Sequence, residues 1–293
     1  MNNDPLIFEL ATAQGKPSSF RKDKDHTCPF CDVKNLSGIY EQEGEMIWLH
    51  NRFPTLRDTL QTVLIESSDH HGDISNYNKE YNRNLMKFAL HCFKKLIATG
   101  QYKSVLWYKN FGPLSGGSLI HPHMQIVGLE HEDGYKYIHE NNFTGIPVFE
   151  NKLIEVNIAT HPVQGYQEIN LNLKSMNQEH GINLWADWIQ KSVQYTLNEM
   201  YKGRCNSYNL FFYPYGNDNQ SLCCKVIPRF YAPPYFVGYK LSQCNDKITL
   251  KREAKNLAKY SYIKNNFYPG VSCYNIKILI KLIIVGDFDN AKK

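Results

Sequence analysis

The sequence contains the same order of helical and extended patterns twice, and this repeat restricts the possible folds more than any other feature. Apolar residues at helical spacing predict a helix over Tyr81–Ala98, which ends near Gly100 and leads into an extended run, Ser104–Tyr108. A second helix is predicted over Trp185–Met200, followed by the extended run Tyr208–Tyr213. Two copies of one unit therefore account for much of the chain.

This repeat predicts an α+β protein with two pseudo-repeated halves, each with an antiparallel sheet and a long helix. Matching Tyr108 with Phe212 gives an offset of 104 residues between the copies. The linker is predicted near His139–Val148, which is polar and contains glycine and proline. The predicted halves are 1–145 and 146–293. A chain of 293 residues is long enough to bury such cores without disulfides.

Composition and charge exclude several classes of protein. With 42% hydrophobic and 21% charged residues, the chain differs from disordered proteins. No stretch reaches the roughly 20 apolar residues of a membrane span, and the N-terminus does not resemble a signal peptide, so we expect a cytoplasmic protein without membrane contact. The eight cysteines are irregularly spaced, which favours metal or redox chemistry over a disulfide framework.

The net charge of +5 belongs to the C-terminal region. Residues 240–293 hold 11 Lys and Arg against 4 Asp and Glu, whereas the remainder is slightly acidic, so nucleic acid is not an expected partner. The spacing of apolar residues predicts an amphipathic helix over Leu250–Tyr262. The apolar segment Lys277–Gly286 is too short to span a membrane and is predicted to be a strand or a docking segment.

The densest chemical signal is the segment Gly116–Gly128, GGSLIHPHMQIVG. On a strand, alternate side chains point the same way, so three polar residues are predicted to share one surface: His121, His123 and Gln125. The loop before them allows close approach of a ligand and offers groups suited to phosphate oxygens: Gly116, Gly117 and Ser118.

These motifs resemble the histidine-triad superfamily and, within it, the galactose-1-phosphate uridylyltransferase-like branch. The branch signature His-Pro-His-Gly-Gln stands here as His121–Gln125, with Met124 in place of the glycine. The order and spacing of the family motifs agree over about Arg21–Gly128, and a weaker match to the family lies at Phe236–Leu241. The other matching elements are CPFC (Cys28–Cys31), NRFP (Asn51–Pro54), Asp69 with His70, and Asn110–Gly112.

The resemblance implies one structural zinc site and a nucleophilic histidine. The implied zinc ligands are Cys28, Cys31, His70 and His121. One alternative is a thiol pair that binds no metal, and another is a zinc site whose fourth ligand is His71 or His26. His123 is the implied nucleophile, attacking an α-phosphorus to form a nucleotidyl-histidine. Gln125 and Ser118 are the implied phosphate-binding residues, with Gly116, Gly117 and Asn110 as further candidate donors. Nucleoside contact is implied for Asn51, Arg52 and Phe53.

Departures from the family pattern limit the prediction. Lys225 and Ile227 stand where other members carry histidines for a second metal, so one metal site is predicted. Lys240 stands where hexose-specific members place a sugar-binding glutamate, which suggests a more anionic acceptor. The sequence predicts a nucleotidyltransferase acting on a nucleoside diphosphate-sugar or related nucleotide. Alternatives are a hydrolase or phosphorylase of nucleotide-sugars or dinucleoside polyphosphates, and a non-catalytic zinc-stabilised nucleotide-binding module. Relatives are usually homodimers, so a homodimer is a further expectation.

Overall fold

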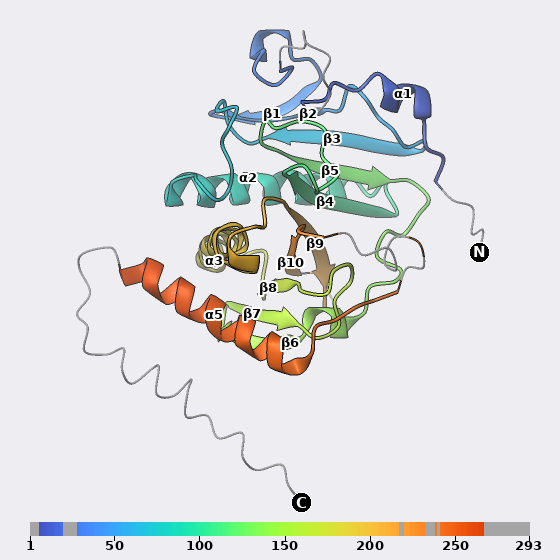
Figure 1. The fold of residues 1–293 in the computed structure, drawn as a ribbon. Helices are drawn as coiled ribbons and strands as arrows, with labels where there is room; N and C mark the ends of the chain where they lie inside the picture. Colours follow the sequence, from blue (N-terminus) through green and yellow to red (C-terminus); the bar gives the residue numbers. More distant parts are fainter. Residues whose placement is uncertain (1–5, 20–27, 217–219, 232–237, 239–240, 267–293) are drawn as a thin grey trace, which may run out of the picture.

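The computed structural model describes residues 6–19, 28–216, 220–231, 238 and 241–266, and its ten strands form one continuous antiparallel sheet (Figure 1). The strands of the first half are β1 (Ile39–Glu43), β2 (Met46–His50), β3 (Thr59–Ile65), β4 (Ser104–Phe111) and β5 (His123–Leu129). Those of the second half are β6 (Gly145–Glu150), β7 (Ile154–Ala159), β8 (Ile169–Leu173), β9 (Tyr208–Tyr215) and β10 (Ser221–Pro228).

The strand order repeats between the halves. Across the sheet it is β1-β2-β3-β5-β4-β9-β10-β8-β7-β6. Each half therefore has the same order when read from its own outer edge inward, and the halves join where β4 pairs with β9. This arrangement confirms the predicted α+β fold with two pseudo-repeated halves. The difference is that the two expected sheets are one, because the edge strands β4 and β9 satisfy each other's backbone groups.

Long helices cover one face of this sheet: α2 (Lys79–Ala98), α3 (Glu179–Asn198) and α5 (Lys247–Asn266). The side chain of Asn78 caps α2 by accepting a hydrogen bond from the Tyr81 backbone N–H at 2.8 Å. The core beneath the helices is centred on Trp107 of β4, whose ring stacks on Phe212 of β9 at 3.6 Å. Shorter helical segments are α1 (Leu10–Gln14), η1 (Val33–Asn35), η2 (Glu140–Phe143) and η3 (Met200–Lys202).

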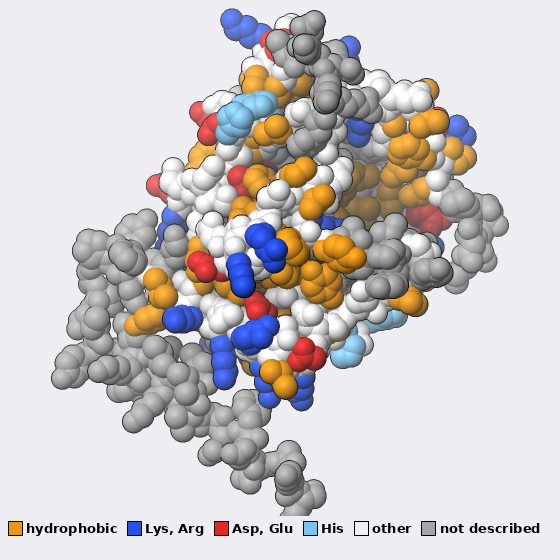
Figure 2. Space-filling model, viewed as in Figure 1, with side chains coloured by type: hydrophobic (Ala, Val, Ile, Leu, Met, Phe, Trp, Pro, Cys, Tyr) orange, Lys and Arg blue, Asp and Glu red, His pale blue; other side chains and the backbone are white. Residues whose placement is uncertain are grey.

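The predicted C-terminal helix is confirmed as α5. Its apolar residues Leu250, Ala254 and Leu257 are buried in the core, as the spacing predicted. Lys and Arg side chains gather over α5 and the adjacent end of α3 (Figure 2). No helix in the described ranges is both long and apolar enough to cross a bilayer. The segment Lys277–Gly286 lies outside the described residues.

Two sequence expectations are wrong in detail. Tyr108 faces Gln125, whereas Phe212 stacks on Trp107 in the core on the opposite face, so a constant offset of 104 residues does not relate the central strands. A shift of one residue reverses the face of a strand residue, and sequence similarity alone did not detect it. The predicted linker His139–Val148 is too long by four residues, because β6 begins at Gly145. Proline is tolerated there because β6 is an edge strand.

Candidate functional site

The candidate site lies on the sheet face opposite the long helices. Strand pairing places Val63 of β3, Gln125 of β5 and Tyr108 of β4 in one cross-strand row on that face. A cavity of about 1020 Å³ lies in front of this part of the sheet. The sequence-predicted residues that line it are His123, Gln125, Gly116, Gly117, Ser118, Asn51, Arg52 and Phe53.

The geometry around His123 specifies which ring nitrogen is available. Its Nδ1 lies 2.8 Å from the backbone carbonyl of His121, a contact in which Nδ1–H donates. This leaves Nε2 without a hydrogen-bond partner among the residues that the structure describes. Burial lowers the pKa of His123 to about 4, so the ring is neutral near pH 7. The site therefore presents a neutral imidazole whose Nε2 has a free lone pair.

Gln125 is oriented by a residue that the sequence analysis did not select. The hydroxyl of Tyr108 donates to Gln125 Oε1 at 2.9 Å, so the Gln125 amide N–H groups are left for a ligand. Burial raises the pKa of Tyr108 to about 12, and this phenol therefore remains a donor at neutral pH. Tyr108 was predicted to be on a strand, but its position opposite Gln125 depends on strand register, which no local pattern revealed.

Lys16 is a second residue that sequence reasoning missed. It lines the same cavity as His123, from the segment after α1. Burial lowers the pKa of Lys16, and its charge is close enough to contribute to the lowered pKa of His123. No ion pair involves Lys16 within the described part of the chain. A partly desolvated cation without a carboxylate partner is suited to an anionic ligand.

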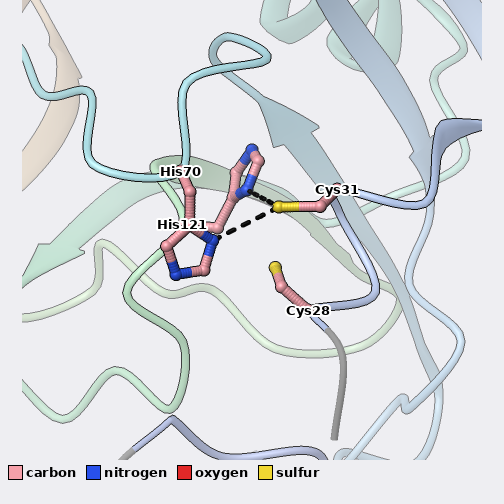
Figure 3. Close-up of side chains that lie close together, drawn as sticks. All are labelled: Cys28, Cys31, His70 and His121. Carbon is pink, nitrogen blue, oxygen red and sulfur yellow. Dashed lines mark hydrogen bonds between the residues drawn. The ribbon is translucent and has the colours of Figure 1, made fainter.

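Four side chains predicted to bind metal converge beside the cavity: Cys28, Cys31, His70 and His121 (Figure 3). Their candidate ligand atoms all lie within 4.8 Å of one another. Cys31 Sγ is 3.3 Å from His70 Nδ1 and 3.4 Å from His121 Nδ1. Tetrahedral zinc with ordinary bond lengths separates sulfur and nitrogen ligands by roughly 3.5 Å, so this donor set fits zinc.

Hydrogen bonds from the other ring nitrogens can orient histidine ligands of a metal. His121 Nε2–H donates to the Ser67 carbonyl at 2.9 Å, which leaves Nδ1 directed at Cys31. Of the alternative ligands, His71 packs its ring against that of His70 but is not part of the cluster. His26 lies outside the described residues. The cluster can hold one metal ion.

Asn110 is the one predicted substrate-binding residue in the described part of the chain that does not line the cavity. Asn110 lies behind the glycine loop, where a Cβ on Gly117 would be 3.2 Å from the Asn110 Cβ, and its Oδ1 accepts a hydrogen bond from Asn209 at 2.6 Å. Lys240 lies outside the described residues. Of the two residues placed at the lost second metal site, Lys225 is fully buried and forms an ion pair with Glu168.

Family models match both halves of the chain. The model described as the N-terminal domain of a domain of unknown function, DUF4931, matches residues 8–132, and the corresponding C-terminal domain model matches residues 135–261. A crystal structure of a DUF4931 family protein from Bacillus cereus is 41% identical and covers 76% of this chain and 98% of its own, with a TM-score of 0.67.

More distant solved structures share the fold. A uridylyltransferase is 15% identical, with a TM-score of 0.62 over 82% of this chain and 93% of its own. An ADP-glucose phosphorylase from Arabidopsis thaliana, solved with ADP-glucose bound, is 12% identical, with a TM-score of 0.61 over 85% and 92% of the two chains. These similarities confirm the predicted histidine-triad-like fold.

One curated relative is similar over a shorter region. A di-/tripeptide transporter of Lactobacillus helveticus is 54% identical over 104 residues, which are 33% of this chain. The match spans only 18% of the length of the transporter.

Proposed function

Because the chain belongs to the DUF4931 family and has the fold of a uridylyltransferase and an ADP-glucose phosphorylase, we propose that it is a nucleotidyltransferase. Its substrate is a nucleoside diphosphate-sugar or related nucleotide, and the reaction passes through a nucleotidyl-His123 intermediate. The observation that carries this proposal is the orientation of His123, which lines the cavity. Its Nδ1–H donates to the His121 carbonyl, while Nε2 has no hydrogen-bond partner among the described residues.

In the proposed first step, the Nε2 lone pair attacks the α-phosphorus of the nucleotide. The Nε2–P bond forms as the bond from the α-phosphorus to the bridging oxygen breaks, and the sugar phosphate leaves with that electron pair. The Nδ1 proton stays on the ring, bonded to the His121 carbonyl, which stabilises the positive charge of the substituted imidazole. An acceptor phosphate oxygen then attacks the same phosphorus and releases neutral His123.

The groups around this reaction centre are donors and cations. We assign the non-bridging phosphate oxygens to Ser118, the Gly116–Gly117 backbone, the Gln125 amide and Lys16, all of which line the cavity. Donors held in place before the reaction stabilise charge that develops on the phosphoryl oxygens. The nucleoside is assigned to the Asn51–Phe53 turn, in which Asn51 Oδ1 accepts a hydrogen bond from the Phe53 N–H at 2.9 Å.

We assign zinc to the Cys28, Cys31, His70 and His121 cluster as a structural ion, because the donor set and spacing fit it. When bound, zinc fixes the segment before β5 and thereby the His121 carbonyl on which His123 depends. We also assign catalysis to residues 1–145 and a degenerate role to residues 146–293. In support, the described residues that line the cavity all fall between Gln14 and Gln125.

A phosphorylase is the second candidate, because the ADP-glucose phosphorylase shares the fold over most of both chains. The same intermediate would form, and inorganic phosphate would replace the sugar phosphate as the acceptor. Lys16 and Arg52 at the cavity are compatible with either anionic acceptor. The two functions therefore differ in the second step alone, and Lys240 stays our candidate for acceptor choice.

The test is to trap the intermediate. The purified protein is incubated with UDP-glucose, ADP-glucose or a dinucleoside polyphosphate, and its intact mass is measured. We expect an acid-labile nucleotidyl adduct that is missing in His123→Ala. His50→Ala is the matched control, because His50 also lines the cavity while its Nδ1 lies 3.4 Å from the Tyr40 hydroxyl.

The acceptor that discharges the adduct identifies the reaction. Discharge by a hexose phosphate indicates a transferase, discharge by inorganic phosphate a phosphorylase, and discharge by water a hydrolase. Nucleotide-induced thermal stabilisation without adduct or turnover would indicate a non-catalytic binding module. Turnover that His123→Ala retains would exclude the covalent mechanism.

A further inference from the structure

The second half of the chain contacts the phosphate loop of the first half, which we define as Gly112–Ser118. The Asn209 side chain, on β9 and 1% exposed, donates to the Ser115 carbonyl at 3.0 Å and to Asn110 Oδ1 at 2.6 Å. Asn110 in turn lies behind Gly117. One amide group of the second half therefore bonds the loop directly and also holds the residue beneath it.

A half-buried arginine orients Asn209. Arg229 Nε–H donates to Asn209 Oδ1, so that the Asn209 amide nitrogen is directed at the loop. The Arg229 Nη2 group donates to Gln164 Oε1 at 2.5 Å. Within the described residues Arg229 bonds these two neutral amides and no carboxylate, although burial lowers its pKa. Its desolvated charge thus serves to position other side chains.

Hydrogen bonds to a buried carboxylate fix the backbone at Gln164. The backbone N–H groups of Val163, Gln164 and Gly165 all donate to the Glu168 carboxylate, at 3.0, 2.6 and 2.9 Å. The buried ammonium of Lys225 lies 3.0 Å from that carboxylate. A continuous set of hydrogen bonds therefore runs from the interior of the second half to the phosphate loop.

The loop also fits closely against the second half at its start. Gly112 has a φ of +83°, and a Cβ there would lie 2.3 Å from the Asn206 carbonyl oxygen. The Leu114 N–H donates to Ser207 Oγ at 3.1 Å. Contacts at both Gly112 and Ser115 mean that the loop conformation depends on β9 and the residues just before it, in the other half.

We propose that Asn209 and Arg229 are positioning residues that hold the phosphate loop in its ligand-binding conformation. This gives the second half a role in the reaction although none of its described residues lines the cavity. The proposal rests on the proposed function where it concerns turnover, but the loop conformation can be measured without any substrate.

The first experiment is hydrogen–deuterium exchange of the full-length protein without ligand. Arg229→Met and Asn209→Asp each remove donors from the network, and we expect exchange in residues 112–118 to accelerate by about tenfold. Arg204→Met is the matched control, because Arg204 lies over the Phe230 ring in the same region and has no bond to the loop. Unchanged exchange at β5 shows that a variant is folded. Arg229→Lys, a milder change, should give an intermediate rate.

The second experiment uses whichever nucleotide forms the adduct with the wild-type protein. We expect Arg229→Met to slow adduct formation about tenfold while binding of the corresponding free nucleoside is unchanged. Loop exchange equal to that of Arg204→Met would overturn the proposal. If the wild-type protein forms no adduct, the proposed function fails, while the exchange measurement still decides whether Asn209 and Arg229 position the loop.

Discussion

Replacing Lys109 by methionine should strongly destabilise the protein, because it leaves two buried carboxylates without a cation. Lys109 is 1% exposed, and its Nζ lies 2.5 Å from Glu66 Oε1 and 3.4 Å from Asp73 Oδ1. Breaking a buried ion pair by removing one partner costs about 3–5 kcal/mol. This is a large share of the roughly 5–15 kcal/mol by which proteins are stable.

Lys225→Met provides the comparison. Lys225 is equally buried and pairs with Glu168, but that carboxylate would keep the three backbone N–H donors of the Val163–Gly165 turn. Hydrogen bonds to the ionised form lower the cost of burying a carboxylate. Among the described residues, Glu66 would keep only the Tyr77 hydroxyl, at 3.3 Å. We therefore expect Lys109→Met to lose more stability than Lys225→Met.

Urea unfolding at pH 7, followed by circular dichroism, measures the difference. With a slope near 3 kcal/mol/M, the Lys109→Met midpoint should fall by about 1–2 M. Burial raises the pKa of Glu66 above its ordinary 4.5, and loss of Lys109 raises it further. When the pKa of a carboxyl is higher in the folded than in the unfolded protein, raising the pH lowers the free energy of unfolding, because the folded state holds the proton more tightly. The stability lost in Lys109→Met should therefore be smaller at pH 5 than at pH 7.

Three results would refute this reasoning. They are an unchanged midpoint in Lys109→Met, a larger loss in Lys225→Met, or a deficit that is the same at pH 7 and pH 5. The double variant Lys109→Met/Glu66→Gln supplies an internal check, because removing the orphaned charge should restore part of the lost stability.

Two further predictions concern the cavity and the metal cluster. Lys16→Met should weaken binding of UDP or ADP about tenfold in calorimetry, since a charge-assisted hydrogen bond is lost, whereas the exposed Lys34→Met should not. Wild-type affinity should decline at alkaline pH with a midpoint below the ordinary lysine value of 10.5, because burial favours the neutral amine, and an identical decline in Lys16→Met would contradict this. Elemental analysis should find about one zinc per chain in the wild type and little in Cys31→Ser. Cys244→Ser, which removes an exposed thiol, should retain the metal, and equal zinc in both variants would argue against the cluster.

Sequence periodicity predicted the helices and strands in which one face is buried along its whole length. The helix predicted over Tyr81–Ala98 is α2, Lys79–Ala98, because its apolar stripe is continuous. The second predicted helix began at Trp185, whereas α3 begins at Glu179, since its first turn is mostly polar. Strand pairing was harder to predict. Tyr108 was matched with Phe212 in the repeat, yet they face opposite sides of the sheet.

The chemical identity of the candidate site came from the sequence, because thiols, imidazoles and amides have fixed donor and acceptor properties. Alternation along one strand predicted that His121, His123 and Gln125 share a face. In the structure β5 begins at His123, so the alternation applies to His123 and Gln125, and His121 lies on the segment before the strand. The tertiary structure decided which atoms remain available. The His121 carbonyl engages Nδ1 of His123, the Tyr108 hydroxyl engages Oε1 of Gln125, and Asn209 reaches the phosphate loop from the other half. The last two contacts join residues that are 17 and 94 positions apart, and their geometry depends on strand register, which no local pattern encodes. The first contact is local, but burial of the ring is what leaves its other nitrogen for a ligand.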